Sequence, residues 1–408
     1  MKKLLFLLIC STLLVGCGDD DGDSVSSSTG SSVSYIGTIS GGSSSLVPSA
    51  LSISPTTSST DLGMWSITIS SSNTFVVENA DGLEVSGTVE NLDSGFVKLT
   101  VSSSNESEPQ AGDIAYGLNV PGVIFFLAPV GDDGEVIPMV KSGTCPSTET
   151  SFLWSLAGAK DSDNNKVTKS CNNTDTEGLD IFGEATINSS EITIPSKYDI
   201  CDNSISGDFT GAFSCTDGVA TITSEGAVDA YMYLTEGGGA IVKTQPGDSD
   251  EKTIVALAGE SSLSISDLEG DYAGVLFIEN DEEGDDSTKP VSATITSGVS
   301  GKIEVTEWDV ENNTLKSGGI SGTIHNFESD TPMNGFIKGK LDVDENQSDE
   351  SIYAFVVCQS DLNANGSGKN IVVCTGQEPK RDSEDNPEQI TDPGAGSDNI
   401  FSLVLVEK

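Results

Sequence analysis

One short segment of the chain carries oxygen-bearing side chains at the spacing of a calcium-binding loop. Asp361, Asn363 and Asn365 alternate with other residues, and Gly366 follows them. Calcium loops place oxygen ligands at positions 1, 3 and 5, and a glycine at position 6 lets the chain turn. Position 12, where such loops need a bidentate carboxylate, is Val372. The spacing therefore favours a hairpin turn, with weak calcium binding by Asp361, Asn363 and Asn365 as the alternative.

Most motifs of known enzymes are missing from the sequence. His325 is the only histidine, and it lies in an alternating segment where a solvent-facing strand position is expected. Asp93-Ser94-Gly95 matches the short motif of aspartic proteases, but those enzymes need two carboxylates that share a proton. No second triplet of this kind occurs. We therefore predict a protein that is not an enzyme, with an unrecognised extracytoplasmic hydrolase as the enzymatic alternative.

The N-terminus carries the signals of an exported and lipidated protein. A basic head at residues 1–3 and an apolar run at residues 4–15 end in Leu14-Val15-Gly16-Cys17, and the acidic run 19–23 follows. These residues resemble the signal peptide and lipobox of bacterial lipoproteins. The resemblance implies that residues 1–16 are removed, that Cys17 is lipidated, and that residues 17–32 form a polar tether. Gly18, where aspartate favours inner-membrane retention, indicates the outer membrane by the same resemblance.

Membrane attachment is expected through this lipid alone. The apolar run is shorter than the roughly 20 residues that a transmembrane helix needs, and no later segment reaches that length without charges. Several acyl chains anchor a protein stably, whereas one does not. We expect the protein at the outer membrane, on the cell surface, with the periplasmic face as the alternative.

Six cysteines remain once Cys10 is removed and Cys17 is lipidated. An even number in an oxidising compartment indicates disulfides rather than zinc ligands, and the chain has no CxxC motif. Because neighbouring cysteines flank what look like hairpins or short loops, we predict the pairs Cys145–Cys171, Cys201–Cys215 and Cys358–Cys374.

The charge of the chain excludes one large class of partners. Acidic residues number 64 against 19 basic ones, which gives a formal net charge of -45. Such a surface repels nucleic acid and anionic lipid, so nucleic-acid binding is not expected. Adaptation to salt, weak calcium binding and solubility are alternative explanations of the acidity.

Short landmarks recur three times in the same order, which predicts three copies of one unit. We assign them to residues 33–145, 146–262 and 263–408. The landmarks are an aromatic residue that opens a strand (Tyr35, Trp154, Tyr272), an alternating segment (66–69, 185–187, 293–296), a Ser-Gly pair (86–87, 206–207, 321–322), a tyrosine strand (Tyr116, Tyr231, Tyr353) and a closing apolar hairpin (123–140, 240–257, 354–373).

Each copy has the pattern of about seven or eight short antiparallel strands separated by turn residues. The fold class is therefore all-β, with a small up-and-down barrel favoured because closure removes exposed edges, and a β-sandwich as the alternative. In the third copy, residues 377–399 are expected to form an acidic loop. The apolar segment 401–406 is expected to pair beside the strand that starts at Tyr272.

These features favour a non-enzymatic binding or structural role, such as adhesion or a place in the cell envelope. A glycan or another surface protein is the expected partner, because tandem copies of a weak site gain avidity for repetitive ligands. The alternative is a carrier that holds a small molecule inside each barrel.

Overall fold

The fold is all-β. The computed structural model describes residues 32–38, 64–79, 82–107, 109–128, 137–141, 143–156, 181–195, 197–199, 204–205, 208–235, 239–244, 252–258, 263–280, 287–298, 301–309, 314–316, 319–326, 335–342, 353–362, 364–377 and 399–408. In these residues the helices are two 3-10 turns, η1 (Ile265–Leu268) and η2 (Ala364–Gly366). No helix in this part of the chain is long and apolar enough to cross a membrane.

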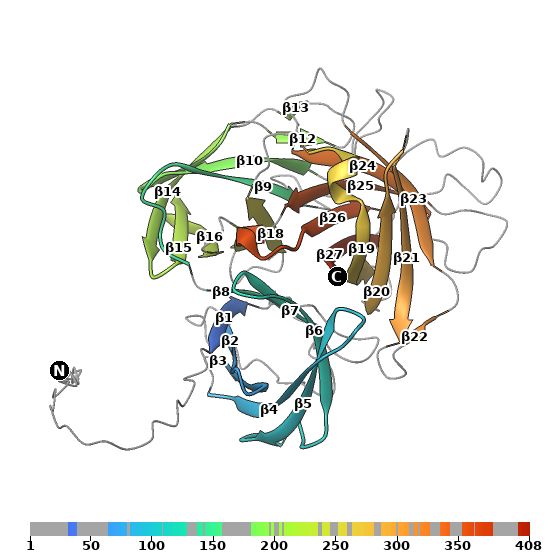
Figure 1. Cartoon of the computed structure of the whole chain (residues 1–408). Helices are drawn as coiled ribbons and strands as arrows, with labels where there is room; N and C mark the ends of the chain where they lie inside the picture. The colour runs from blue at the N-terminus through green and yellow to red at the C-terminus, as the bar shows by residue number, and fades with distance from the viewer. Residues whose placement is uncertain are drawn as a thin grey trace, which may run out of the picture.

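The first eight strands close into an up-and-down barrel, which we call barrel 1 (Figure 1). Each strand pairs antiparallel with the next, and β8 returns to pair with β1. Closure leaves no unpaired edge strand. The strands are β1 (Val33–Thr38), β2 (Met64–Ile69), β3 (Thr74–Asn79), β4 (Glu84–Asn91), β5 (Phe96–Ser104), β6 (Ile114–Val120), β7 (Ile124–Ala128) and β8 (Ile137–Lys141).

The next ten strands form barrel 2, in which eight strands pair in a ring of the same kind. β10 pairs with β11, β11 pairs with β14, and β18 returns to β9. The short strands β12 and β13 extend the sheet from β10, outside this ring. The strands are β9 (Thr150–Leu156), β10 (Ile181–Ile187), β11 (Glu191–Ile194), β12 (Lys197–Asp199), β13 (Ser204–Ile205), β14 (Phe209–Thr216), β15 (Val219–Ser224), β16 (Ala227–Leu234), β17 (Ala240–Thr244) and β18 (Lys252–Ala258).

The last nine strands form barrel 3. Eight of them pair in a ring, and β22 pairs with the end of β21 outside it. The C-terminal strand β27 pairs with β19 and sets Glu407 opposite Tyr272, so the predicted pairing of the last apolar segment is confirmed. The strands are β19 (Gly270–Asn280), β20 (Ser287–Thr296), β21 (Gly301–Asp309), β22 (Thr314–Leu315), β23 (Ile320–Asn326), β24 (Phe336–Asp342), β25 (Tyr353–Asp361), β26 (Ile371–Gln377) and β27 (Asn399–Glu407).

The all-β prediction with three small up-and-down barrels is therefore confirmed, and the sandwich alternative is not the fold. The predicted acidic loop falls between β26 and β27, and its residues 378–398 lie outside the described residues.

The strand registers correct three landmarks of the repeat. The second copy's counterpart of Tyr35 and Tyr272 is Phe152, because it faces Ala185 as Tyr35 faces Ile67, whereas Trp154 lies two residues further on. Its counterpart of the Ser-Gly pair is 210–211 rather than 206–207. The predicted hairpin 354–373 is β25–β26, and the third copy closes with β26–β27. The spacing in the sequence led to these wrong assignments because insertions lengthen the loops between the paired strands.

The glycine of the Ser-Gly landmark has a packing role in barrel 1. Gly87 points inward from β4 and lies opposite Phe75 of β3. A Cβ atom at Gly87 would lie 2.0 Å from the carbonyl oxygen of Thr100 and 2.6 Å from Cε1 of Phe75. Glycine is therefore required where the Phe75 ring crosses β4.

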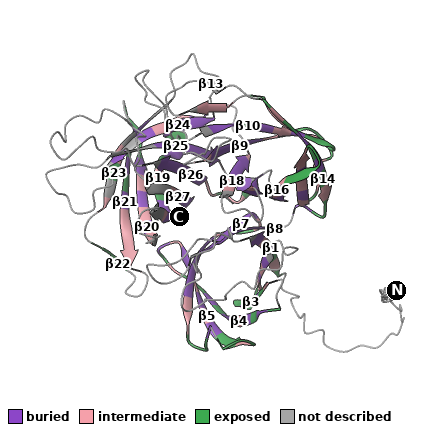
Figure 2. Cartoon of the chain, turned by 180° about the vertical axis from the view of Figure 1, so that it is seen from behind, coloured by how far each residue is buried: buried purple, intermediate pink, exposed green. Residues whose placement is uncertain are grey.

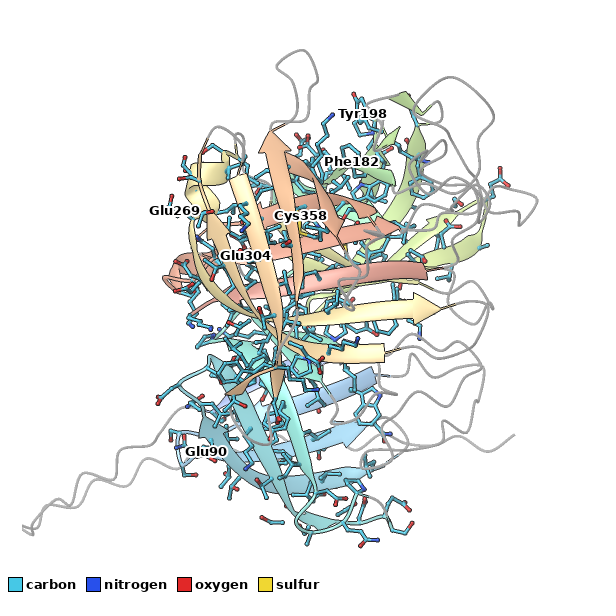
Figure 3. The ribbon with its side chains drawn as sticks, turned by 90° about the vertical axis from the view of Figure 1, so that its right-hand side faces the viewer. Glu90, Phe182, Tyr198, Glu269, Glu304 and Cys358 are labelled. Atoms are coloured by element: carbon cyan, nitrogen blue, oxygen red, sulfur yellow. A yellow bond between two sulfur atoms is a disulfide. The ribbon has the colours of Figure 1, made fainter. Side chains whose placement is uncertain are left out.

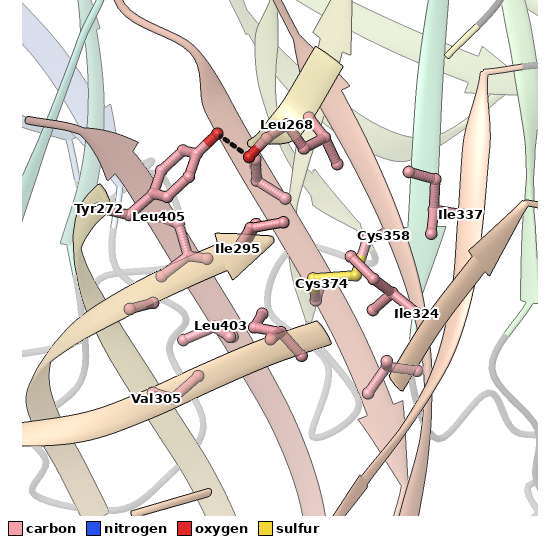
Figure 4. Packing of buried hydrophobic residues seen from close by; sticks show 14 of the residues in the cluster. Leu268, Tyr272, Ile295, Val305, Ile324, Ile337, Cys358, Cys374, Leu403 and Leu405 are labelled. Carbon is pink, nitrogen blue, oxygen red and sulfur yellow. Dashed lines mark hydrogen bonds between the residues drawn. A yellow bond between two sulfur atoms is a disulfide. The ribbon is translucent and has the colours of Figure 1, made fainter. Parts of the chain in front are cut away.

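Each barrel is filled by its own apolar core. Strand residues alternate between buried and exposed positions, as in β4, so one face of each strand points inward. Tyr35 and Phe125 fill barrel 1, and Phe152 lies in barrel 2. In barrel 3, the Cys358–Cys374 disulfide lies among the apolar side chains of the interior (Figure 4).

A fourth apolar cluster, which we call the shared core, joins the three barrels through their outer faces. Residues 124–127 of β7 form an unbroken apolar run, which is typical of a strand that is buried on both faces. Phe125 points into barrel 1 and Phe126 points into the shared core. In Figure 2 the largely buried strands β7, β9, β25 and β26 lie where the barrels meet. The shared core contains Phe96, Leu118, Val120, Val123, Ile124, Phe126, Val140, Tyr233, Ile241, Leu257, Ala273, Val275, Ala364, Ile371, Val373, Val404 and Val406.

Candidate functional sites

The described disulfides confirm one predicted pair and contradict two. Cys358 of β25 bonds to Cys374, which lies directly opposite on β26. Cys145 bonds to Cys215, so the predicted pairs Cys145–Cys171 and Cys201–Cys215 are wrong. Cys171 and Cys201 lie outside the described residues. Disulfides persist in oxidising compartments, so both bonds indicate an extracytoplasmic protein.

The Cys145–Cys215 bond exists because the segment after barrel 1 runs across the end of barrel 2. Gly143 donates its backbone N–H to the carbonyl oxygen of Leu234, at the end of β16. The carbonyl oxygen of Gly143 itself lies so close to Gly218 that a Cβ atom at Gly218 would be only 2.3 Å from it. This contact brings the chain to β14, where Cys215 packs against the interior of barrel 2. The disulfide therefore attaches the segment that connects barrels 1 and 2 to the end of barrel 2.

The residues of the predicted calcium loop form the turn between β25 and β26. Asp361 is buried at the end of β25, and Asn365 lies in η2, where its side chain is not described. Asn363 lies outside the described residues, as does Cys17 with its tether. Ala364 accepts a hydrogen bond from the N–H of Ser367 and packs into the shared core. The favoured hairpin turn is thus present, and calcium binding by Asp361, Asn363 and Asn365 stays a prediction.

Within the described ranges, no group of three or more histidine, cysteine, aspartate or glutamate side chains is arranged to hold a metal ion.

Buried tyrosines hold one end of barrels 1 and 3. The Tyr272 hydroxyl donates to the carbonyl oxygen of Leu268 over 2.7 Å, which fixes η1 against the end of barrel 3 (Figure 4). The Tyr35 hydroxyl donates to Oδ1 of Asn119 over 2.9 Å in barrel 1. Burial raises the pKa of both phenols, and the nearby charge of Glu407 helps to raise the pKa of Tyr272 to about 12.

Alkaline pH should therefore destabilise the fold through these phenols. Above pH 10 the unfolded chain loses a proton that folded Tyr272 keeps, so the free energy of unfolding falls as the pH rises from about 10 to 12. The slope is at most about 1.4 kcal/mol per pH unit for each group. In denaturant titrations from pH 8 to 12, Tyr272→Phe should lose about 1 kcal/mol at pH 8 and show a shallower alkaline decline. Parallel pH curves for the variant and wild type would contradict this.

An aromatic and charged patch lies on the outer face of barrel 3, where β19, β20 and β21 run side by side. Lys408 extends its ammonium group to 2.8 Å from the Ser292 hydroxyl and to 5.8 Å from the centre of the Trp308 ring. Asp271 and Thr294 complete the patch with a 2.8 Å hydrogen bond between their side chains. Burial lowers the pKa of Lys408, while the charge of Asp271 acts in the opposite direction.

The five residues of this patch (Asp271, Ser292, Thr294, Trp308 and Lys408) combine a half-buried indole ring with hydroxyl, carboxylate and ammonium groups. The indole packs partly against the shared core and lies beneath the Lys408 ammonium, so its exposed part offers the stacking area, and the polar groups around it offer hydrogen bonds in both directions. This is a set of groups suited to a polar polymer. Trp308 and Lys408 carry no sequence signal of a shared site, because their proximity depends on the pairing of β27 with β19.

No protein-family model matches the chain, and no curated protein is significantly similar to it.

Proposed function

We propose that this protein is a lipid-anchored surface protein of the outer membrane that binds through the outer faces of its barrels. The observation that carries the proposal is the filling of the barrel interiors. Large side chains such as Tyr35, Phe125 and Tyr272 are fully buried there and pack in continuous apolar clusters. Ligand contact is then left to the outer faces, so the carrier alternative is not favoured.

The patch of barrel 3 supports a glycan as the partner. A strongly acidic chain repels anionic partners, which favours a neutral polymer over an acidic one. The shared core holds the barrels in fixed relation, so the tether supplies reach while the three barrels present one rigid surface. A structural role in the cell envelope would need the same anchor and the same rigidity as the binding role. It differs from the binding role because it requires no glycan.

The anchor and the binding role are tested together on cells that produce the wild-type chain, Cys17→Ala or Cys10→Ala. The wild-type protein should take up an alkyne-palmitate label, stay in the membrane fraction and attach cells to neutral glycan surfaces. Cys17→Ala should lose the label, the membrane fraction and the attachment. Cys10→Ala is the matched control, because it changes a cysteine inside the removed signal and should behave as wild type.

A third variant separates binding from anchoring. Trp308→Ala should keep the label and the membrane fraction but lose most glycan attachment, because the stacking ring is gone. A label that persists in Cys17→Ala contradicts the anchor. Attachment to no glycan surface by labelled wild-type cells contradicts the binding role and leaves the structural one.

A further inference from the structure

The joint between barrels 2 and 3 combines an aromatic contact with buried polar groups. Phe182 of β10 and Phe336 of β24 pack with their ring centres 5.0 Å apart. Phe182 lies opposite Ser155 in the β9–β10 pairing, and Phe336 lies opposite Gln359 in the β24–β25 pairing. The ring contact therefore sets Ser155 and Gln359 on facing sides of the joint. Phe182 lies beside Tyr198 in Figure 3.

One hydrogen bond crosses this joint and fixes the orientation of Gln359. Its Nε2 donates to the backbone carbonyl oxygen of Val255 over 2.7 Å. Val255 belongs to β18, which pairs with β9 in the register that places Leu257 opposite Leu153. Continuing that register brings position 255 to Ser155. The Nε2 atom of Gln359 therefore reaches the strand next to Ser155. The amide oxygen Oε1 of the same side chain then lies within the joint.

Three polar atoms at this joint are buried and have no hydrogen-bond partner among the described residues. They are Oε1 of Gln359, Oγ of Ser155 and Oγ1 of Thr375. The three residues are 0%, 3% and 7% exposed. Thr375 lies on β26, next to Gln359's strand, and both β25 and β26 contact β9. Burying a polar atom without a hydrogen-bond partner is destabilising, so three such atoms together require an explanation.

We infer that this joint is a binding site for ordered water, which bridges barrels 2 and 3 through Gln359, Ser155 and Thr375. Gln359 Oε1 only accepts hydrogen bonds, whereas each hydroxyl both donates and accepts. A molecule that donates to the amide oxygen and also exchanges hydrogen bonds with the hydroxyls satisfies all three, and water does this. A metal ion would satisfy the acceptors but would leave the hydroxyl protons unpaired. Buried water of this kind typically makes about three hydrogen bonds and is costly to remove.

The first test is a high-resolution crystal structure of the full chain carrying Cys17→Ala, which prevents lipidation. Water density is expected about 2.7–3.2 Å from Gln359 Oε1 and from at least one of the two hydroxyls. Two results would overturn the inference. One is a dry joint, and the other is a peak with the short distances and high coordination of a cation.

The second test uses the melting temperature of the double variant Ser155→Ala/Thr375→Val. If water bridges the joint, the variant removes its hydroxyl partners while Gln359 stays buried, so the melting temperature should fall by several degrees. If the hydroxyls are simply unpaired, their removal should leave the melting temperature unchanged or raise it. Thr88→Val, on the exposed face of barrel 1, is the matched control and should cause no shift. The crystal structure decides the question should the double variant fail to fold.

Discussion

Replacing Phe126 by alanine should destabilise the protein as severely as a deletion inside a barrel, by about 3–5 kcal/mol. Phe126 faces outward from barrel 1, and in an isolated barrel the loss of an outward side chain would cost about 0.5 kcal/mol or less. Here the side chain is fully buried in the shared core, against residues of barrels 2 and 3. Chemical denaturation of the lipid-free chain measures the change in the free energy of unfolding.

Two further variants serve as references for the Phe126→Ala result. Phe125→Ala removes the neighbouring ring from the interior of barrel 1 and should cost as much as Phe126→Ala. Val76→Ala truncates an outward apolar residue of β3 that lies outside the shared core, and should change stability little. A Phe126→Ala effect close to that of Val76→Ala would mean that the barrels are not packed together.

Because the shared core spans all three barrels, we also expect them to unfold in one transition in the wild-type protein.

The second large effect is expected from the Cys145–Cys215 disulfide. The bond closes a loop of 70 residues, for which the chain-entropy model gives about 4 kcal/mol of stabilisation. In denaturant titrations without a reducing agent, the free energy of unfolding of Cys145→Ala/Cys215→Ala should be lower than that of the wild type by about that amount. The bond also fixes the connection from barrel 1 to the end of barrel 2, so its loss should expose residues 143–150 to proteolysis.

Peptide mapping without reduction provides the control for this prediction. A peptide that links Cys145 to Cys215 is expected in the wild-type protein, together with one that links Cys358 to Cys374. The double variant should lose the first and keep the second. A linked peptide that joins Cys145 to Cys171 would contradict the structure and restore the pairing of sequence neighbours.

The local features of this fold are predictable from the amino-acid sequence. Period-two alternation in runs such as β4, with turn residues between the runs, predicted the strands and their up-and-down order. The apolar segment at 401–406 predicts a strand beside the one that starts at Tyr272. In the structure this segment pairs with β19. Cys358–Cys374 was predictable because a hairpin sets the two residues opposite each other.

Features that depend on contacts between distant segments appear only in the folded structure. Cys145 finds Cys215 because its segment crosses the end of barrel 2, a path that no spacing of cysteines encodes. The strand registers moved the repeat position of Trp154 to Phe152, since inserted loops change spacing without changing pairing. The run at 124–127 indicated burial on both faces but not what covers the outer one.

The shared core and the hydrated joint therefore belong to the tertiary structure alone. Side-chain pattern along one strand records which faces are apolar, because neighbouring residues alternate between the two faces of a sheet. It does not record which other strand meets that face, since packing between sheets is set by shape and by the path of the chain in between. Gln359 and Ser155 are 204 residues apart, and contacts between barrels 2 and 3, such as those of Phe182 with Phe336 and of Gln359 with Val255, bring them together.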